Sequence, residues 1–269
     1  MKANYISFDL ENWYDSEFVH DKNQKEDLVV DGLNKVLCVL KKHDVKATFF
    51  VTGRVAERYP GCLKEIFSQG HEIASHGYSH QMLTKLTKKK IIYEIKKSKE
   101  AIKKITNKSP IGFRAPCWSI TQDKFYIYQI LKKEGYKYSS SLFPLDAGLY
   151  GSSKFPMNPF YPLKDKKFLE IPIRHYSLGK IRIPFSGGFY FRLLPKFMLY
   201  YFFRRLEKLN RKVVLYLHPW EFCNDIPKVK IGLLGKFITY YGISENLDKL
   251  DYILNKFKFV PLKEALKND

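Results

Sequence analysis

Titratable side chains follow several apolar, strand-like segments of this chain, at the point where each segment ends. They are Asp9, Glu11, His76, His80, Arg114 and His218. In parallel α/β folds, active sites lie at the carboxyl ends of the strands. We therefore expect these six side chains to gather at one edge of a sheet.

Asp9 and Glu11 are two residues apart at a strand end, so both side chains can point the same way. Two carboxylates there suit a metal ligand beside a general base. His76 and His80 are four residues apart, which on a helical turn places two imidazoles on one face, able to bind one metal ion. The alternatives are a capping acid beside a surface acid, and a histidine pair that binds nothing.

Arg114 and His218 complete the set. Arg114 can hold a carboxylate through two parallel hydrogen bonds, or it can be a surface arginine packed on Trp118. His218 ends a buried segment and precedes Pro219; a core histidine is the alternative. Together the six residues predict a divalent metal, a carboxylate base, an arginine that orients the base and a histidine acid.

Strand-like and helix-like segments alternate along the chain. The expected strands are 4–8, 47–52, 71–75, 111–114, 136–139, 213–217 and 258–260. The expected helices are 26–43, 53–59, 61–69, 87–105, 121–134, 195–209 and 244–257. Repeated strand–helix alternation predicts an α/β fold with parallel strands covered by helices.

The stretch 144–184 breaks this alternation. It holds six of the 13 prolines and three glycines. Aromatic residues within this stretch and directly before it argue against disorder, and they are Phe143, Tyr150, Phe155, Phe160 and Tyr161. We expect an ordered excursion over the active face. The 269 residues fit either one barrel or nearly two domains, but the candidate residues run from 9 to 218 without a break. A single domain over 1–269 is therefore expected.

The chain is strongly basic. Its 47 Lys and Arg against 27 Asp and Glu give a net charge of +20, which suggests an anionic partner. The lysine-rich segment 85–108 is one amphipathic helix with its isoleucines inward, so its lysines are expected to face solvent. Because no nucleic-acid-binding pattern occurs, we do not expect the anionic partner to be a nucleic acid. The apolar run 197–203, flanked by basic residues, predicts a core helix or a helix on an anionic membrane surface.

Cysteine use and the chain's start bear on the compartment. Cys38, Cys62, Cys117 and Cys223 form no CxxC pair, so buried thiols in a reducing compartment are expected. The first residues run into a strand rather than a signal peptide, and no apolar run reaches about 20 residues. A cytoplasmic location is expected, with peripheral contact at the inner membrane face as an extension.

The ordered set of residues resembles the NodB-like polysaccharide deacetylases (carbohydrate esterase family four) over about residues 4 to 260. The matching motifs are Ser7-Phe8-Asp9-Leu10-Glu11, His76 with His80, Arg114 with Pro116, and Leu217-His218. The flanking stretches 47–50 and 70–76 match as well. The sequence motifs at Gly187 to Pro195 and at His218 to Glu221 indicate the branch of this family that has Phe-Asp-x-Glu and His-Pro-Trp-Glu motifs.

This resemblance implies a single deformed (β/α)7-type barrel that removes N- or O-acetyl groups from sugars or glycans with a divalent metal. Glu11, His76 and His80 would hold the metal, for which we expect zinc, with cobalt, nickel or manganese as alternatives. Asp9, held by Arg114, would act as the base. Oligomeric state, sugar and acetyl position are left open by the sequence.

The remaining roles also follow from the resemblance. His218 would protonate the leaving group, and a backbone N–H after Pro116, at Cys117 or Trp118, would stabilise the oxyanion. Aromatic faces for a sugar ring are expected from four residues. They are Trp118, Phe189, Tyr190 and Trp220.

The chain departs from the family pattern at two places. Leu10 stands where the commonest pattern has a second acid, so Glu11 takes the ligand role. Ser139-Ser140-Ser141 replaces the acid that pairs with the last histidine, and Glu221 is a candidate substitute. Two alternative functions therefore stay open: a deformylase of a lipid-linked amino sugar, and a catalytically impaired barrel that binds glycan.

Overall fold

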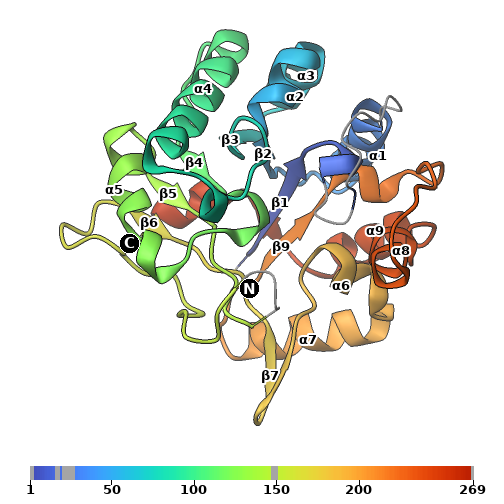
Figure 1. Cartoon of the computed structure of the whole chain (residues 1–269). Coiled ribbons are helices and arrows are strands. Elements are labelled where there is room, and N and C mark those ends of the chain that lie inside the picture. The colour runs from blue at the N-terminus through green and yellow to red at the C-terminus, as the bar shows by residue number, and fades with distance from the viewer. Residues whose placement is uncertain (1–2, 16–18, 20–27, 147–150, 268–269) are drawn as a thin grey trace.

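The computed structural model describes residues 3–15, 19, 28–146 and 151–267. Its centre is a curled sheet of parallel strands (Figure 1). Strand β1 (Asn4–Leu10) pairs with β2 (Thr48–Val51) on one side and with β9 (Val214–Leu217) on the other. Beyond β2 the order continues with β3 (Glu72–Ser75), β4 (Gly112–Phe113), β5 (Tyr138–Ser139) and β6 (Leu169–Glu170), while β10 (Phe259–Val260) pairs with the start of β1. Among the described residues no strand pairing joins β6 to β9, so the sheet is a half-barrel.

Helices surround these strands in Figure 1. They are α1 (Val29–Lys42), α2 (Gly53–Arg58), α3 (Pro60–Ser68), α4 (Lys88–Thr106), α5 (Tyr126–Lys133), α6 (Gly188–Leu193), α7 (Lys196–Lys208), α8 (Leu233–Tyr240) and α9 (Asn246–Lys256). Helix α1 shows why they pack there: its apolar residues recur every three or four positions, so Leu33, Val36 and Leu40 are buried against the sheet. The predicted α/β fold is confirmed, and each expected strand is present. Strand β1 extends to Leu10, beyond its expected end at residue 8, and the other six are slightly shorter than expected.

The stretch 144–184 is expected to lie over the active face, but most of its described residues pack elsewhere. It supplies β6 and an antiparallel hairpin of β7 (Tyr176–Leu178) and β8 (Ile181–Ile183), which packs on α7 through stacked rings of Tyr176 and Phe202. Arg174 donates to the carbonyl of Lys212, which ties the stretch to the start of β9. Seven residues of the stretch line a cavity beside Tyr5, at the other end of β1 from Asp9, and they are Met157, Asn158, Pro159, Leu169, Ile171, Pro172 and Arg174. Tyr150 lies outside the described residues.

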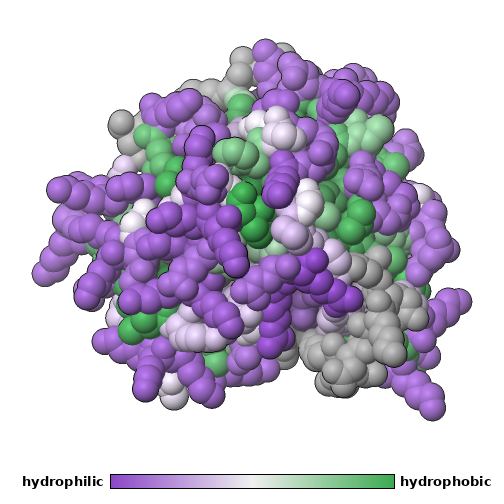
Figure 2. Space-filling model, turned by 90° about the horizontal axis from the view of Figure 1, so that it is seen from above, coloured by the Kyte–Doolittle hydropathy of each residue, from purple (hydrophilic) through white to green (hydrophobic). Residues whose placement is uncertain are grey.

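Helix α4 carries much of the basic charge on its solvated side, as predicted. Ile91, Ile95 and Ile102 are buried, and the face seen from above α3 and α4 is mostly hydrophilic (Figure 2). In the run 197–203, Leu199, Phe202 and Phe203 are buried, whereas Phe197 and Tyr201 are exposed. The run is therefore a helix with one side in the core, and its contact with a membrane stays a prediction. No helix within the described ranges is long and apolar enough to cross a membrane.

No disulfide joins the four cysteines, all of which lie in the described part. Cys223 is buried, but Cys38 is exposed. The expectation that all four are buried is therefore wrong, because Cys38 lies on the solvent side of the amphipathic helix α1.

Candidate active site

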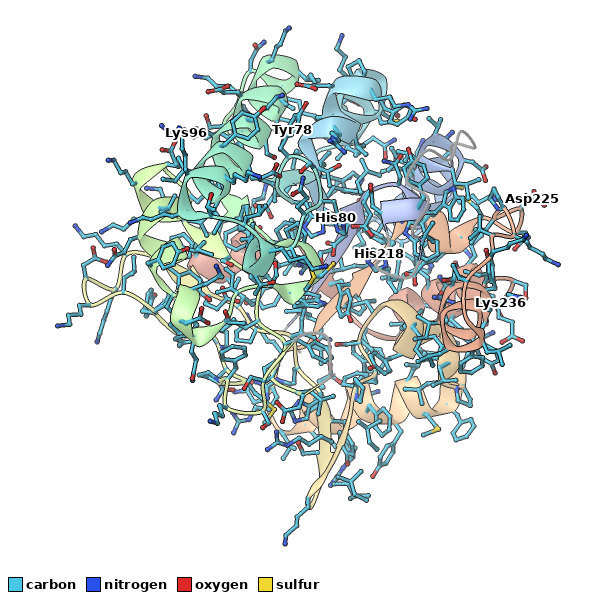
Figure 3. All side chains as sticks on the ribbon, viewed as in Figure 1. Tyr78, His80, Lys96, His218, Asp225 and Lys236 are labelled. Atoms are coloured by element: carbon cyan, nitrogen blue, oxygen red, sulfur yellow. The ribbon has the colours of Figure 1, made fainter. Side chains whose placement is uncertain are left out.

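The six titratable residues singled out in the sequence line one cavity of about 160 Å³. It opens at the carboxyl ends of β1, β3, β4 and β9, because parallel strands bring these ends to the same edge. Figure 3 shows His80 and His218 close together near the centre of the molecule, although they lie far apart in the sequence. The sequence prediction that these side chains gather is confirmed.

Three of them form a compact donor set for a metal ion. Ligand atoms of Glu11, His76 and His80 all lie within 4.8 Å of one another, and all three residues are buried. Oε2 of Glu11 is 2.6 Å from Nε2 of His80 and 3.4 Å from Nε2 of His76. This carboxylate oxygen is buried and makes no hydrogen bond of normal geometry, so three electron-pair donors converge on one point.

The tautomer of His76 follows from its surroundings. Its Nδ1 lies 2.9 Å from the carbonyl oxygen of Arg114, which can only accept, so Nδ1 carries a hydrogen. The lone pair of the neutral ring is therefore on Nε2, which faces Glu11. Such an outer hydrogen bond is the usual way in which proteins orient a metal-binding histidine. The residues present fit a divalent ion.

The charges of the donor set favour the same conclusion. Burial disfavours a charged Glu11, but His80 and His218 outweigh it and hold the pKa of Glu11 well below its usual range. Burial also opposes a charged His80, yet the carboxylate of Glu11 raises the pKa of His80 to about 9. A positive charge next to Glu11 is thus strongly favoured. A divalent ion can supply it once His80 loses its proton.

A buried acid on α4 holds the loop that carries both histidines. Glu94 accepts hydrogen bonds from the backbone N–H groups of Tyr78 and Ser79 and from the Ser79 hydroxyl. Gly77 provides the left-handed turn at φ 73° that this loop requires. Our sequence reasoning missed Glu94. The available signal was its position on the buried face of α4, next to Ile95.

Replacing Glu94 with Gln should weaken divalent-metal binding by about 10- to 100-fold, the usual cost of losing an outer support of metal ligands. The amide keeps the size, but only one of its two terminal atoms can accept, whereas Glu94 accepts from both loop N–H groups through Oε2 and from the Ser79 hydroxyl through Oε1. Metal affinity is measured by competition with a chelator. Glu100→Gln, the same change on the exposed side of α4, should leave the affinity unchanged. Equal affinities in both variants would contradict the role of Glu94.

Asp9 and Arg114 form a buried ion pair beside the donor set. Nη1 of Arg114 lies 2.6 Å from Oδ1 of Asp9, and both side chains are almost fully buried. The arginine also donates to the carbonyl and the hydroxyl of Ser140 and to the Ser7 hydroxyl, so its position is held from several sides. The other carboxylate oxygen, Oδ2, lies 3.8 Å from Nε2 of His76. Arg114 therefore orients Asp9 next to the donor set.

His218 pairs with Glu221, the substitute considered for the missing family acid. Nδ1 of His218 lies 3.1 Å from Oε2 of Glu221, whose other oxygen accepts from Nε of Arg192 at 2.9 Å. Burial disfavours the imidazolium, but Glu221 and Glu11 outweigh it and raise the pKa of His218 to about 9. The serines that replace the family acid support Arg114 instead, through Ser140.

Five of the six residues assigned to substrate binding line the cavity. They are Cys117, Trp118, Phe189, Tyr190 and Trp220. Pro116 is not among the lining residues. Trp118 and Trp220 are nearly buried, and Trp220 stacks on His218, so they offer edges more than open faces. Cys117 and Trp118 both have positive φ values, 51° and 50°. Such backbone conformations are strained for residues other than glycine, and they occur often at active sites.

Several lining residues were not singled out from the sequence. They are Ala115, Gly188, Arg192, Tyr216, Glu221, Ile238 and Thr239, of which Glu221 was considered only as a substitute partner. Arg192, Ile238 and Thr239 lie on α6 and α8, two helices that the sequence analysis did not predict. Arg192 is almost fully buried. The signal for it was the arginine inside the Gly187 to Pro195 stretch.

Two family models together match most of the chain. Residues 21–139 match the model described as polysaccharide deacetylase, and residues 140–267 match a domain of unknown function (DUF3473). The first segment carries both histidines and Arg114, and the second carries His218 and Glu221. Residues 21–139, a little under half of the chain, are therefore similar to the polysaccharide deacetylase family.

Individual proteins agree with this family. A peptidoglycan deacetylase from Helicobacter pylori is 32% identical over 171 residues, which are 62% of this chain and 56% of that protein. The chain thus aligns with little more than half of this relative's length. A candidate polysaccharide deacetylase structure from Mycobacterium smegmatis superposes with a TM-score of 0.64 at 19% identity, covering 99% of this chain and 91% of that chain.

The fold is also shared with a protein described as inactive. A pseudoenzyme of carbohydrate esterase family four from Bacillus anthracis has a TM-score of 0.53 at 17% identity, and covers 97% of this chain and 63% of that chain. The fold alone therefore does not decide whether a chain with this architecture is active. The side chains in the cavity must decide it.

Proposed function

We propose that this chain is a metal-dependent hydrolase that removes an N- or O-acetyl group from a sugar or polysaccharide. One observation carries the proposal: the donor set of Glu11, His76 and His80 is flanked, in one cavity, by Asp9 and His218. The names of the relatives support the same chemistry. The two matched segments act as one unit in this proposal, because β9, which leads into His218, pairs directly with β1.

The donor set favours zinc. Two histidine nitrogens and one carboxylate oxygen are the protein ligands of several catalytic zinc sites, which keep a further position open. Cobalt, nickel and manganese remain alternatives for the same ligands. A divalent ion held there would polarise the acetyl carbonyl and lower the pKa of water.

The chain's own residues supply the proton transfers. Asp9 lies next to the donor set and is oriented by Arg114, so it is placed to take a proton from the attacking water. His218 lies across the cavity with Nε2 3.8 Å from Oε1 of Glu11, and the Glu221 carboxylate beside its Nδ1 raises its pKa, which favours the protonated ring. It can therefore donate a proton to the leaving amine or alcohol. The strained turn at Cys117 and Trp118 brings backbone N–H groups to the same cavity edge.

The direct test measures acetate released by metal-loaded protein. Acetylated amino sugars, nucleotide sugars, chito-oligosaccharides and peptidoglycan fragments are the substrates, and the metal content of the protein is determined in parallel. Release of acetate that requires a stoichiometric divalent ion supports the proposal. Formate released from N-formyl sugars, without acetate from any acetylated one, favours the deformylase. Glycan binding without either product favours an impaired, glycan-binding barrel.

Replacing Glu221 with Gln should shift the pH dependence of kcat/KM. The acid form of His218 is the active one here, so activity falls as pH rises through its pKa. Loss of the Glu221 charge lowers this pKa by about one unit or more, and the alkaline fall should begin at lower pH. Glu245→Gln, a change at an exposed carboxylate, should leave the profile unchanged. An unshifted profile in the Glu221 variant would rule out this pairing as the source of the high pKa.

A further inference from the structure

We propose that helix α8 docks on an anionic lipid bilayer and that the cavity acts on acetylated sugars displayed there, linked to lipid. The docking stands on the surface of the molecule alone. The identity of the substrate also rests on the proposed function.

The outward face of α8 is apolar. Leu233 is 86% exposed, the highest value of any large apolar side chain in the described residues, and Leu234 is 67% exposed. Phe237 and, directly after the helix, Tyr241 continue this face three or four residues apart and are each 45% exposed. The inward face has the small residues Gly235 and Thr239. This is the reverse of an ordinary surface helix, whose apolar side faces the core.

Positive charge flanks this apolar face. Residues 228–241 contain three lysines and no acidic residue. Lys236 lies on α8 itself at the edge of the molecule (Figure 3), and Lys228 and Lys230 precede the helix. None of the three forms an ion pair within the part of the chain that the structure describes. Apolar side chains surrounded by lysines are typical of helices that lie in the interface of an anionic membrane.

The same helix forms one wall of the active-site cavity. Ile238 and Thr239 line it, and the ring of Phe237 contacts the ring of Phe189, another lining residue, at 5.3 Å between centroids. The carbonyl of Ile238 accepts a hydrogen bond from Arg192, which also binds Glu221. A bilayer against α8 would therefore lie next to the cavity mouth, where a sugar attached to a lipid can reach His218.

A second exposed apolar surface serves as the matched control. Phe197 and Tyr201 on α7 are 70% and 49% exposed, and Arg204 and Arg205 follow on the same helix. This is the helix that the sequence suggested as a membrane contact. Neither aromatic residue lines the active-site cavity. The two surfaces have similar composition. Comparing variants of the two therefore distinguishes docking next to the cavity from general adhesion of a basic protein to an anionic membrane.

Flotation with vesicles tests the docking. Wild-type protein should float with vesicles of phosphatidylcholine and phosphatidylglycerol and stay unbound with phosphatidylcholine alone. The double variant Leu233→Ser/Leu234→Ser should bind on the order of tenfold more weakly, whereas Phe197→Ser/Tyr201→Ser should bind like wild type. Circular dichroism and thermal unfolding confirm that both variants are folded. Equal binding of the α8 variant and wild type, or loss only in the α7 variant, would overturn the proposal.

Activity then tests the substrate class. On a soluble N-acetylated chito-oligosaccharide, both double variants should keep wild-type rates. On lipid-linked N-acetylglucosamine in the same vesicles, only the α8 variant should be slower, by about the factor lost in binding. If wild type releases no acetate from either substrate, the proposed function fails. If wild type is active and the α8 variant matches it on vesicles, only the membrane proposal fails.

A second copy of the chain is the rival occupant of this face. Light scattering after size-exclusion chromatography measures whether the protein is a monomer or a dimer. A wild-type dimer that becomes monomeric in the Leu233→Ser/Leu234→Ser variant would overturn membrane docking, and a monomer in both proteins supports it.

Discussion

Replacing His80 with Ala is expected to abolish stoichiometric metal binding and to lower kcat/KM by at least about 10³-fold. His80 is the donor closest to Glu11, and it is held in a buried site where water cannot easily replace a lost ligand. A bound ion supplies several kcal/mol of transition-state stabilisation, and each 1.36 kcal/mol corresponds to tenfold in rate. Metal analysis of the purified protein and acetate release measure the two effects.

His43→Ala is the matched control for this change. His43, directly after the end of α1, pairs with Asp251 on α9 and does not line the cavity, so its variant should keep both metal and activity. If the His80 variant still holds one divalent ion per chain and turns over substrate like wild type, the donor set is assigned wrongly. If Glu11 and His76 still bind zinc weakly in the His80 variant, a high concentration of added zinc should restore part of its activity.

Replacing Asp9 with Asn should lower kcat by about 10² to 10⁴-fold, the usual contribution of a general base. Asn has nearly the same shape but cannot take a proton, and it leaves Arg114 without a charged partner. Because both side chains are almost fully buried, the free energy of unfolding should also fall, by about 3–5 kcal/mol. Kinetics, metal content and thermal unfolding are measured on the same preparation.

The Asp9 variant should retain its divalent ion, unlike the His80 variant. This difference separates loss of the base from loss of the metal. Asp31→Asn, a change at an exposed residue on α1 that pairs with Lys35, is the control for a lost acid. An Asp9→Asn protein that is folded, metal-loaded and as active as wild type would show that another group acts as base.

The comparison with a pseudoenzyme of the same fold makes this pair of variants informative. A shared fold cannot tell an active barrel from an inactive one. All six titratable residues converge in this chain, and Glu221 pairs with His218. An inactive wild-type protein with metal bound would locate the defect at Leu10 or at the serines, where the chain departs from the family.

Local spacing in the sequence was enough to predict the alternating α/β fold and to single out candidate metal ligands, whereas the choice of Glu11, His76 and His80 as the donor set followed from the family resemblance. The offset between Asp9 and Glu11 allows both side chains to point the same way. The apolar period of helices such as α1 determines which side meets the sheet. The alternation of a strand and the 3.6-residue period of helices such as α1 are short-range properties. For this reason they are readable without coordinates. The helical turn expected at His76 and His80 is wrong, because residues 76–80 form an irregular loop with positive φ at Gly77 and His80.

Tertiary structure alone decided which distant groups support the site. Glu94 reaches the histidine loop only because α4 packs beside β3, and Arg192 reaches Glu221 only because α6 and α8 close over the end of β9. The exposed leucines of α8 look like core residues in the sequence, since the pattern does not say which face meets solvent. The raised pKa of His218 has one local cause, Glu221 three residues further on, and one distant cause, Glu11. The burial of His218, which opposes this shift, and its approach to Glu11 depend on contacts between residues far apart in the chain, and local spacing carries no information about these contacts.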